Sequence, residues 1–188
     1  MSKLLNRNEA FSFLNENMKN GNLIKHSIAT EAVMRSLARK LGHDETLWSI
    51  TGLIHDIDLE QTKDDMTKHA VTAAEMLKGY DFPEDGIKAI LAHNGDVLNI
   101  DRVTEFELAL TCAETITGMI VATTLVYPDK KIKSVKPKSV KKRLKEKLFA
   151  KNVNRDSIML CEKLGITIDE FILLSLEAMC EIADELGL

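Results

Sequence analysis

The chain is poor in residues that break regular structure or form covalent cross-links. Its 188 residues include only three prolines and nine glycines, which fall mostly between periodic segments. The three cysteines, Cys112, Cys161 and Cys180, are scattered and form no CxxC pair. This spacing excludes a disulfide framework or a zinc knuckle and indicates reduced thiols in a cytoplasmic protein.

Long apolar runs are also missing. The sequence has no stretch of about 18 uncharged apolar residues, the length that spans a membrane. Its N-terminal segment, MSKLLNRNEAFSFLNENMKN, carries polar and charged residues among its apolar positions. We therefore expect no transmembrane helix, no membrane partner and no secretory signal.

Alternation typical of strands is sustained nowhere, except briefly around residues 131–135. Apolar residues instead recur three or four positions apart, which predicts amphipathic helices. Gly42 is expected to stop one helix, Asp44 and Ser139 to cap two others, and Pro83 to lie in a first turn. The predicted helices cover residues 8–19, 22–41, 44 to about 55, 67–78, 83–93, 104–126, 139 onward, 156–164 and 169–186.

These features predict a single all-α domain. With 188 residues, 45% of them hydrophobic, the chain is long enough for one well-buried core. We expect a helical bundle over residues 1–128 that carries the functional site. Residues 129–188 are expected to form a basic segment and C-terminal helices that pack on this core as an extension.

One apolar stretch contains charged groups. Residues 52–61 read GLIHDIDLEQ, so that His55 and Asp56 are adjacent and Asp58 follows. Burying an ionised carboxylate costs roughly several kcal/mol unless a partner or a metal ion compensates its charge. The doublet therefore needs a compensating group.

Four of the five histidines occupy inward-facing positions on predicted helices: His26, His55, His69 and His93. The fifth, His43, lies between two helices and is interpreted as a turn or cap residue. A lone histidine on an apolar face is more often a hydrogen-bonded core residue than a ligand. Four of them on separate inward faces, one beside a buried aspartate, indicate a shared ion, because imidazole with carboxylate suits first-row transition metals.

This ordered set resembles the pattern of the HD superfamily of metal-dependent phosphohydrolases, which takes its name from the His-Asp doublet. The segment LGHDETLWSITGLIHDID is similar to the approach to the doublet in small HDIG-type members. His69 and His93 resemble the extra histidines of members that hold two metals. ETITGMIVATTLVYP and the basic KSVKKRLKEKLFA resemble one small branch of the superfamily, so that the likeness extends over nearly the whole chain.

Two positions depart from the family pattern. The closing acidic ligand is usually aspartate, and the matching residue here is Glu114. After the doublet, the glycine and the frequent lysine of HDIG-type members are replaced by Asp58 and Leu59. Lys63 or Lys68 could then contact a phosphate, or Asp58 could act as an acid or a further ligand. Asn94, next to His93, is a further candidate for substrate binding.

The resemblance implies a chemistry and a set of ligands. His26, His55, Asp56 and Glu114 would hold one ion, and Asp56 could bridge to a second ion held by His69 and His93. Asp56 and Asp58 are the candidate catalytic acids. The implied cofactor is one or two divalent transition metal ions, from iron, manganese, cobalt, nickel or zinc, since ligand type does not separate them.

The net charge of −4 hides one polarised segment. Residues 129–151, DKKIKSVKPKSVKKRLKEKLFAK, contain eleven Lys or Arg against two acids. Such a run is most often a solvated helix face, although it can also attract a phosphorylated ligand or nucleic acid. Phe149 is its only aromatic residue, so it lacks the stacking side chains of single-strand binders.

Three hypotheses for the function follow. The first, which we favour, is a hydrolase of phosphate esters or anhydrides, acting on a nucleotide or another small phosphorylated metabolite. The second is a degenerate HD domain that serves as a binding or regulatory module with little hydrolase activity. The third, binding of nucleic acid through the basic segment, is the least favoured. The sequence leaves the oligomeric state open, with a homodimer among the options.

Overall fold

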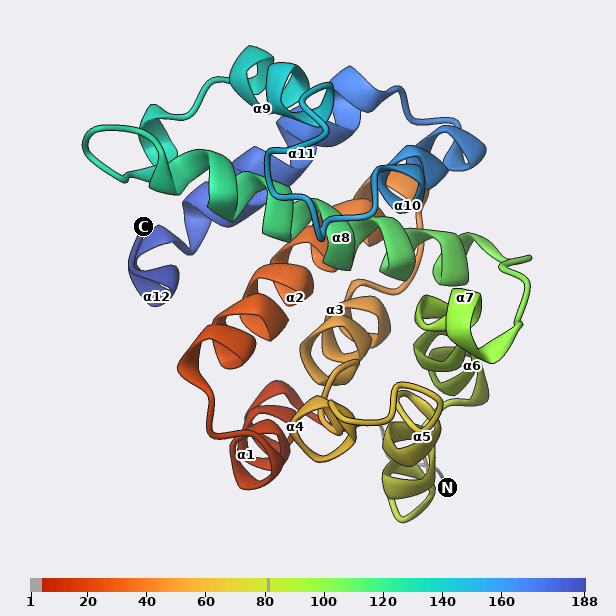
Figure 1. Cartoon of the computed structure of the whole chain (residues 1–188). Helices are drawn as coiled ribbons and strands as arrows, with labels where there is room; N and C mark the ends of the chain where they lie inside the picture. Colours follow the sequence, from red (N-terminus) through yellow and green to blue (C-terminus); the bar gives the residue numbers. More distant parts are fainter. Residues whose placement is uncertain (1–4, 81) are drawn as a thin grey trace.

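The computed structural model describes residues 5–80 and 82–188, and over these residues it is built from helices without strands (Figure 1). The predicted all-α fold is therefore confirmed; residues 1–4 of the predicted core lie outside the described part. The elements are α1 (Arg7–Asn17), α2 (Gly21–Leu41), α3 (Glu45–Ile54), α4 (Leu59–Thr62), α5 (Val71–Lys78), α6 (Glu84–His93), α7 (Gly95–Leu98), α8 (Glu105–Leu125), the 3-10 helix η1 (Ile132–Ser134), α9 (Pro137–Leu144), α10 (Arg155–Met159), the 3-10 helix η2 (Leu160–Leu164), α11 (Ile168–Glu181) and α12 (Ala183–Leu186).

Helix α8 is the centre of the arrangement. In Figure 1 it crosses the middle of the molecule, with α3 and α6 on one side and α9 and α10 on the other. By length and composition it could cross a membrane, with a mean hydropathy of 1.5, but 72% of that stretch is buried inside the bundle. A helix that is apolar on all sides and surrounded by other helices is a core helix, and α8 fits that description.

Close packing of α2 on α3 depends on one glycine. A Cβ atom on Gly52 would lie 3.0 Å from both the Thr30 carbonyl oxygen and the Met34 Cγ atom. The absence of a side chain lets the two helices approach, and this contact aligns His26 on α2 with the end of α3. Asp44 caps α3 as predicted, since its side chain accepts hydrogen bonds from the amides of Thr46 and Leu47.

A buried carboxylate fixes α1 against α2. Glu31 is 2% exposed and accepts hydrogen bonds from Arg7 at 2.6 and 2.9 Å and from Arg35 at 2.6 Å. Two guanidinium groups thus compensate the charge that burial would otherwise penalise.

The predicted start of one helix was wrong, and the reason bears on the site. Residues 67–78 were expected to be helical, but α5 begins only at Val71. The carboxylate of Asp58 accepts the backbone amides of Ala70 at 2.9 Å and Ala73 at 3.1 Å, and Ala70 has a positive φ of 69°. His69 therefore lies in the turn before the helix and not on its face.

Other boundaries differ in smaller ways. Ser139 does not cap α9, which starts with Pro137; the Ser139 hydroxyl contacts the Tyr127 hydroxyl instead, at 2.7 Å. Pro83 precedes α6 as its N-cap residue. The last predicted helix is interrupted at Ile182, which separates α11 from α12. Residues 131–135, where a brief strand was conceivable, contain η1.

The C-terminal helices share the core of the preceding ones. Buried residues of α11, among them Phe171 and Ile172, belong to the same hydrophobic cluster as Val33 of α2 and Ile120 of α8. On the surface, Lys141 of α9 pairs with Asp169 of α11 at 2.6 Å. Residues 152–154, between α9 and α10, reach the site described next.

Candidate metal centre

Four imidazoles converge on the carboxylate of Asp56. The Nε2 atoms of His26 and His55 lie 3.7 and 3.4 Å from its Oδ2 atom. The Nε2 atoms of His69 and His93 both lie 3.3 Å from its Oδ1 atom. Two groups with the spacing of metal ligands result, and both contain Asp56. We call His26, His55 and Asp56 the first half-site, and His69, His93 and Asp56 the second half-site.

Hydrogen bonds at the opposite ring nitrogen fix how each imidazole is protonated. His55 Nδ1 lies 2.8 Å from the Gly52 carbonyl oxygen, and His93 Nδ1 contacts the Ile90 carbonyl oxygen. His69 Nδ1 lies 2.9 Å from the Asp58 carboxylate. Because carbonyl and carboxylate oxygens only accept, these Nδ1 atoms carry hydrogen. A neutral ring then has its lone pair on Nε2. The Nε2 atoms of His69 and His93 lie 3.0 Å apart, so one of them donates a hydrogen to the other.

His26 also carries a hydrogen on Nδ1, and here a hydroxyl group accepts it. Thr117 Oγ1 donates to the Glu114 carbonyl oxygen at 2.6 Å and lies 3.0 Å from His26 Nδ1. Since its hydrogen is already used, the hydroxyl accepts from His26 Nδ1. All four histidines therefore present Nε2 to the carboxylate, the arrangement that protein ligands adopt around a metal ion.

One atom tests directly whether the residues fit a metal ion. His55 is fully buried, and its Nε2 atom has no hydrogen-bond partner in the described part of the chain. Burial lowers the pKa of His55 to about 3 against the opposing effect of Asp56, so the ring is neutral near pH 7. A buried lone pair with no donor facing it suits a cation, and imidazole with carboxylate suits a divalent transition metal. The residues fit the ion.

Electrostatics differ at His69. Burial alone would lower its pKa, but hydrogen bonds to Asp56 and Asp58 outweigh that effect and raise the pKa to about 9. Burial also opposes ionisation of Asp56, yet the imidazoles of His55, His69 and His93 hold its pKa well below the ordinary value. In the metal-free chain, a proton on His69 therefore supplies positive charge beside the ionised Asp56.

Glu114 lies at the edge of this centre. It lines one cavity together with His26 and His93, and its carboxylate accepts a hydrogen bond from Thr115 Oγ1. Burial raises its pKa, and the charge of Asp56 acts in the same direction. It belongs to neither half-site among the described residues, so its role as the closing ligand stays a prediction.

The other predicted residues are placed as follows. Asp58 is fully buried and faces His69 and the amides of Ala70 and Ala73, so that its carboxylate orients the His69 ring. Asn94 donates its amide hydrogens to the carbonyls of Met66 and His69 and lines the cavity beside Glu114.

Lys63 and Lys68 lie apart from the cavities beside the metal centre. Both side chains are exposed, and Lys68 pairs with Asp65 at 3.2 Å. Neither lysine lines either cavity that contacts His26. His43, interpreted from the sequence as a turn residue, stacks on Trp48 and contacts Glu105 at 2.6 Å.

Two cavities adjoin the centre, and both contact His26 and Gly118. One, of about 480 Å³, is lined mainly by polar side chains from α6 to α8 and from residues 152–157. The other, of about 520 Å³, lies between α2, α8 and residues 186–188. Sequence reasoning missed Thr117, Asn152 and Lys25, because only the packing of distant segments brings them to the site.

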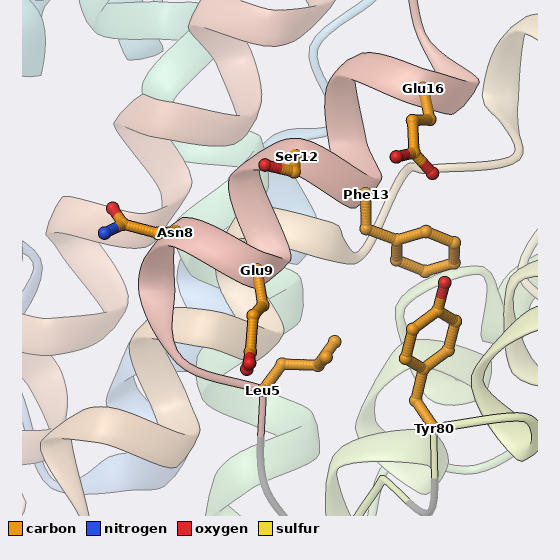
Figure 2. A pocket seen from close by; sticks show the side chains of 7 residues that line it. All are labelled: Leu5, Asn8, Glu9, Ser12, Phe13, Glu16 and Tyr80. Atoms are coloured by element: carbon orange, nitrogen blue, oxygen red, sulfur yellow. The ribbon is translucent and has the colours of Figure 1, made fainter.

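A larger cavity, of about 590 Å³, is remote from this chemistry. It is formed by α1 and Tyr80, and Figure 2 shows the rings of Phe13 and Tyr80 facing each other at its edge, with centroids 4.6 Å apart. None of the histidines or acids of the metal centre lines it.

The helical bundle and its centre of four histidines and a shared aspartate define a helical protein built to bind divalent metal ions. The model of the family described as "HD domain" matches residues 23–116, half of the chain. The chain belongs to the HD domain family, and the resemblance inferred from the sequence is confirmed. Members of this superfamily are metal-dependent phosphohydrolases.

Several similar curated proteins are named ribonuclease Y. That of Sulfurovum sp. is 27% identical over 168 residues, which are 87% of this chain and 32% of that protein. Those of Lactobacillus acidophilus and Clostridium novyi are 33% and 37% identical over 88 and 76 residues, or 47% and 40% of this chain and 16% and 15% of the relatives. The chain thus spans a third or less of these relatives. No solved structure matches it significantly.

Proposed function

We propose that this chain hydrolyses phosphate esters or anhydrides of a nucleotide or another small phosphorylated metabolite, with divalent metal ions held by the two half-sites. The observation that carries the proposal is the convergence of four Nε2 atoms on one buried carboxylate, with His55 Nε2 lacking a hydrogen-bond partner among the described residues. Such ions, when bound, lower the pKa of water and polarise a phosphoryl group.

The chain's own residues have distinct tasks in this proposal. His26 and His55 present neutral imidazoles to one oxygen of Asp56, and His69 and His93 present theirs to the other. Asp58 fixes the ring of His69. The cavity beside Glu114 gives a phosphoryl group access to both half-sites, because His26 and His93 both line it.

RNA is a second candidate substrate, favoured by the names of the relatives and by the basic segment. The expectation that nucleic acid is an unlikely partner fits these names poorly. In residues 129–151, the ion pairs within the described chain involve only Lys141 and Arg143, so nine lysines of the segment have no acidic partner. This segment leads directly into Asn152 and Asn154, which line the cavity. We propose it as an electrostatic approach surface for polyanions.

The test begins with chain purified without chelator and loaded with manganese, iron, cobalt, nickel or zinc. Elemental analysis is followed by a screen of phosphorylated metabolites and of a short RNA, with Asp56→Ala as control. We expect metal-dependent phosphate release that the control lacks. Clearly less than one metal ion per chain after loading would instead support the degenerate binding module. Cleavage of RNA alone, weakened by salt, would select the second candidate.

A further inference from the structure

The cavity between α2, α8 and residues 186–188 differs in chemistry from the polar cavity on the other side of His26. Its apolar wall comes from Ala29, Val121, Ala122 and Leu125 together with Leu186 and Leu188. The polar side chains in the lining are Asn22, Lys25, His26 and Thr117. No Phe, Tyr or Trp of the described chain lines the cavity. A concave, mostly aliphatic site of a few hundred Å³ is the usual form of a pocket for a small organic group.

This cavity adjoins the metal centre at three residues. His26 belongs to the first half-site, Thr117 accepts the hydrogen bond of His26 Nδ1, and Gly118 lines both cavities. Gly118 brings no side chain between the two cavities, and a Cβ atom there would meet only Val153, at 3.5 Å. The aliphatic wall is therefore the apolar surface beside His26 that the ester substituent of a phosphoryl group at the first half-site would meet.

We propose that this aliphatic pocket binds the organic group of the substrate, and that this group is a non-aromatic, apolar alcohol esterified to phosphate. The absence of Phe, Tyr and Trp among the lining residues removes most of the stacking that nucleobases find in their usual sites. An aliphatic wall gains free energy from each methylene group that leaves water. The inference rests on the proposed phosphohydrolase function and specifies its substrate class.

The reaction is a hydrolysis that balances without a further reactant. The oxygen of one water molecule forms a bond to phosphorus, and the bond between phosphorus and the ester oxygen breaks. The alcohol leaves with one proton of that water, and phosphate keeps the other. The apolar pocket contacts only the alcohol and takes no part in proton transfer.

A series of n-alkyl phosphates and n-alkyl phosphonates, from methyl to hexyl, tests the pocket on the full chain loaded with metal. The esters report hydrolysis, whereas the phosphonates cannot be hydrolysed and report binding by calorimetry. We expect kcat/KM and phosphonate affinity to rise about fourfold for each methylene until the pocket is filled, which is the factor that burial of one methylene gives.

Substitutions on α8 test whether the dependence on chain length arises in this pocket. Ala122→Leu fills the pocket and should abolish the dependence on chain length in both assays. Val121→Ala enlarges it and should move the optimum to a longer chain, and it serves if the leucine variant does not fold. Thr46→Leu adds an equally large side chain at an exposed position of α3, outside the cavities at the metal centre, and should leave the series unchanged.

The outcomes separate the pocket from the catalytic function. Hydrolysis of the esters without dependence on chain length overturns the pocket and leaves the phosphohydrolase. Phosphonate affinity that rises with chain length, without hydrolysis of any ester, supports the pocket and overturns hydrolysis of alkyl phosphates. Absence of any chain-length dependence in phosphonate binding overturns the inference whatever the hydrolysis assay shows.

Discussion

The two oxygens of Asp56 face histidine pairs with different electrostatic states. In the first half-site, His55 is fully buried, its pKa is lowered to about 3, and its Nδ1 atom bonds a neutral carbonyl. In the second, His69 bonds the carboxylate of Asp58, and the pKa of His69 is raised to about 9. The first half-site is thus ready for a cation near pH 7, whereas the second already holds a proton in its place.

The difference comes from the complete burial of His55, which lowers its pKa, and from what lies behind each ring. A carbonyl group orients an imidazole without adding charge, but a carboxylate also stabilises its protonated form. A metal ion entering the second half-site must displace the proton of His69, whereas His55 has none to release. The two ions should therefore differ in affinity and in dependence on pH.

The largest effect should come from the residue that both half-sites share. Asp56→Ala is expected to abolish both metal binding and phosphate release, since the two half-sites lose the ligand that they share. The fold should survive, because His69 can release its proton once Asp56 is gone, so that no buried charge is left without a partner there. Elemental analysis and circular dichroism measure the two effects. A variant with wild-type metal content and activity would contradict the assignment.

Removal of the second pair of histidines should separate the half-sites. If His69 and His93 are ligands, the double variant His69→Ala, His93→Ala should bind one ion in place of two, with His26, His55 and Asp56 still occupied. If they contact only the substrate, the variant should keep the metal content of the parent and lose activity alone. Metal titration followed by elemental analysis distinguishes the two results.

Much of this arrangement could be predicted from sequence, and the exceptions have physical causes. The helices and the inward direction of His26, His55 and His93 follow from local periodicity. His69 was assigned to a helix face because its neighbours are spaced like one. That spacing does not reveal that the carboxylate of Asp58, eleven residues earlier, accepts hydrogen bonds from the amides of Ala70 and Ala73 at the start of α5. The contacts of Thr117 with His26, and of residues 152–154 with the cavity, depend on tertiary packing that no local pattern encodes.

Asp58 should act on the second half-site only. Asp58→Asn keeps the shape but removes the charge that raises the pKa of His69. We expect metal affinity there to fall about 10-fold to 100-fold, the usual effect of losing the partner of a ligating histidine. The first half-site should keep its affinity, as shown by calorimetric titration of the two sites. Equal weakening of both would instead indicate general loss of structure.

The pH dependence of metal affinity should distinguish the two half-sites in the unmodified chain. Metal affinity of the second half-site should rise about tenfold per pH unit from neutrality to about pH 9, because one proton leaves His69 for each ion bound. Over the same range, the low pKa of His55 should give the first half-site a weaker dependence. Calorimetry in buffers of different ionisation enthalpy counts the protons released.

The unfolding free energy of the metal-free chain should also depend on pH, because the pKa values of His69 and His55 are shifted in opposite directions. The raised pKa of His69 adds stability that is fully present below about pH 6.5 and is lost as pH rises to about 9. The lowered pKa of His55 works in the opposite direction, so its contribution is present above about pH 6.5 and is lost as pH falls toward 3. Urea titrations should therefore give a maximum in unfolding free energy near pH 6.5. A stability that still rises from pH 7 to 9 would contradict the assigned proton on His69.

The smallest effect should come from the hydroxyl that orients His26. Thr117→Val keeps the size of the side chain but removes the acceptor of His26 Nδ1, so the ring can rotate or change its tautomer. Because His55 and Asp56 still hold the ion, we expect affinity at the first half-site to fall by no more than about tenfold. Thr123→Val is a matched control, since that hydroxyl is buried on α8, bonds the Met119 carbonyl at 2.8 Å and lines neither cavity. If both variants weaken metal binding equally, the loss comes from α8 as a whole and the hydroxyl of Thr117 has no specific part in holding His26.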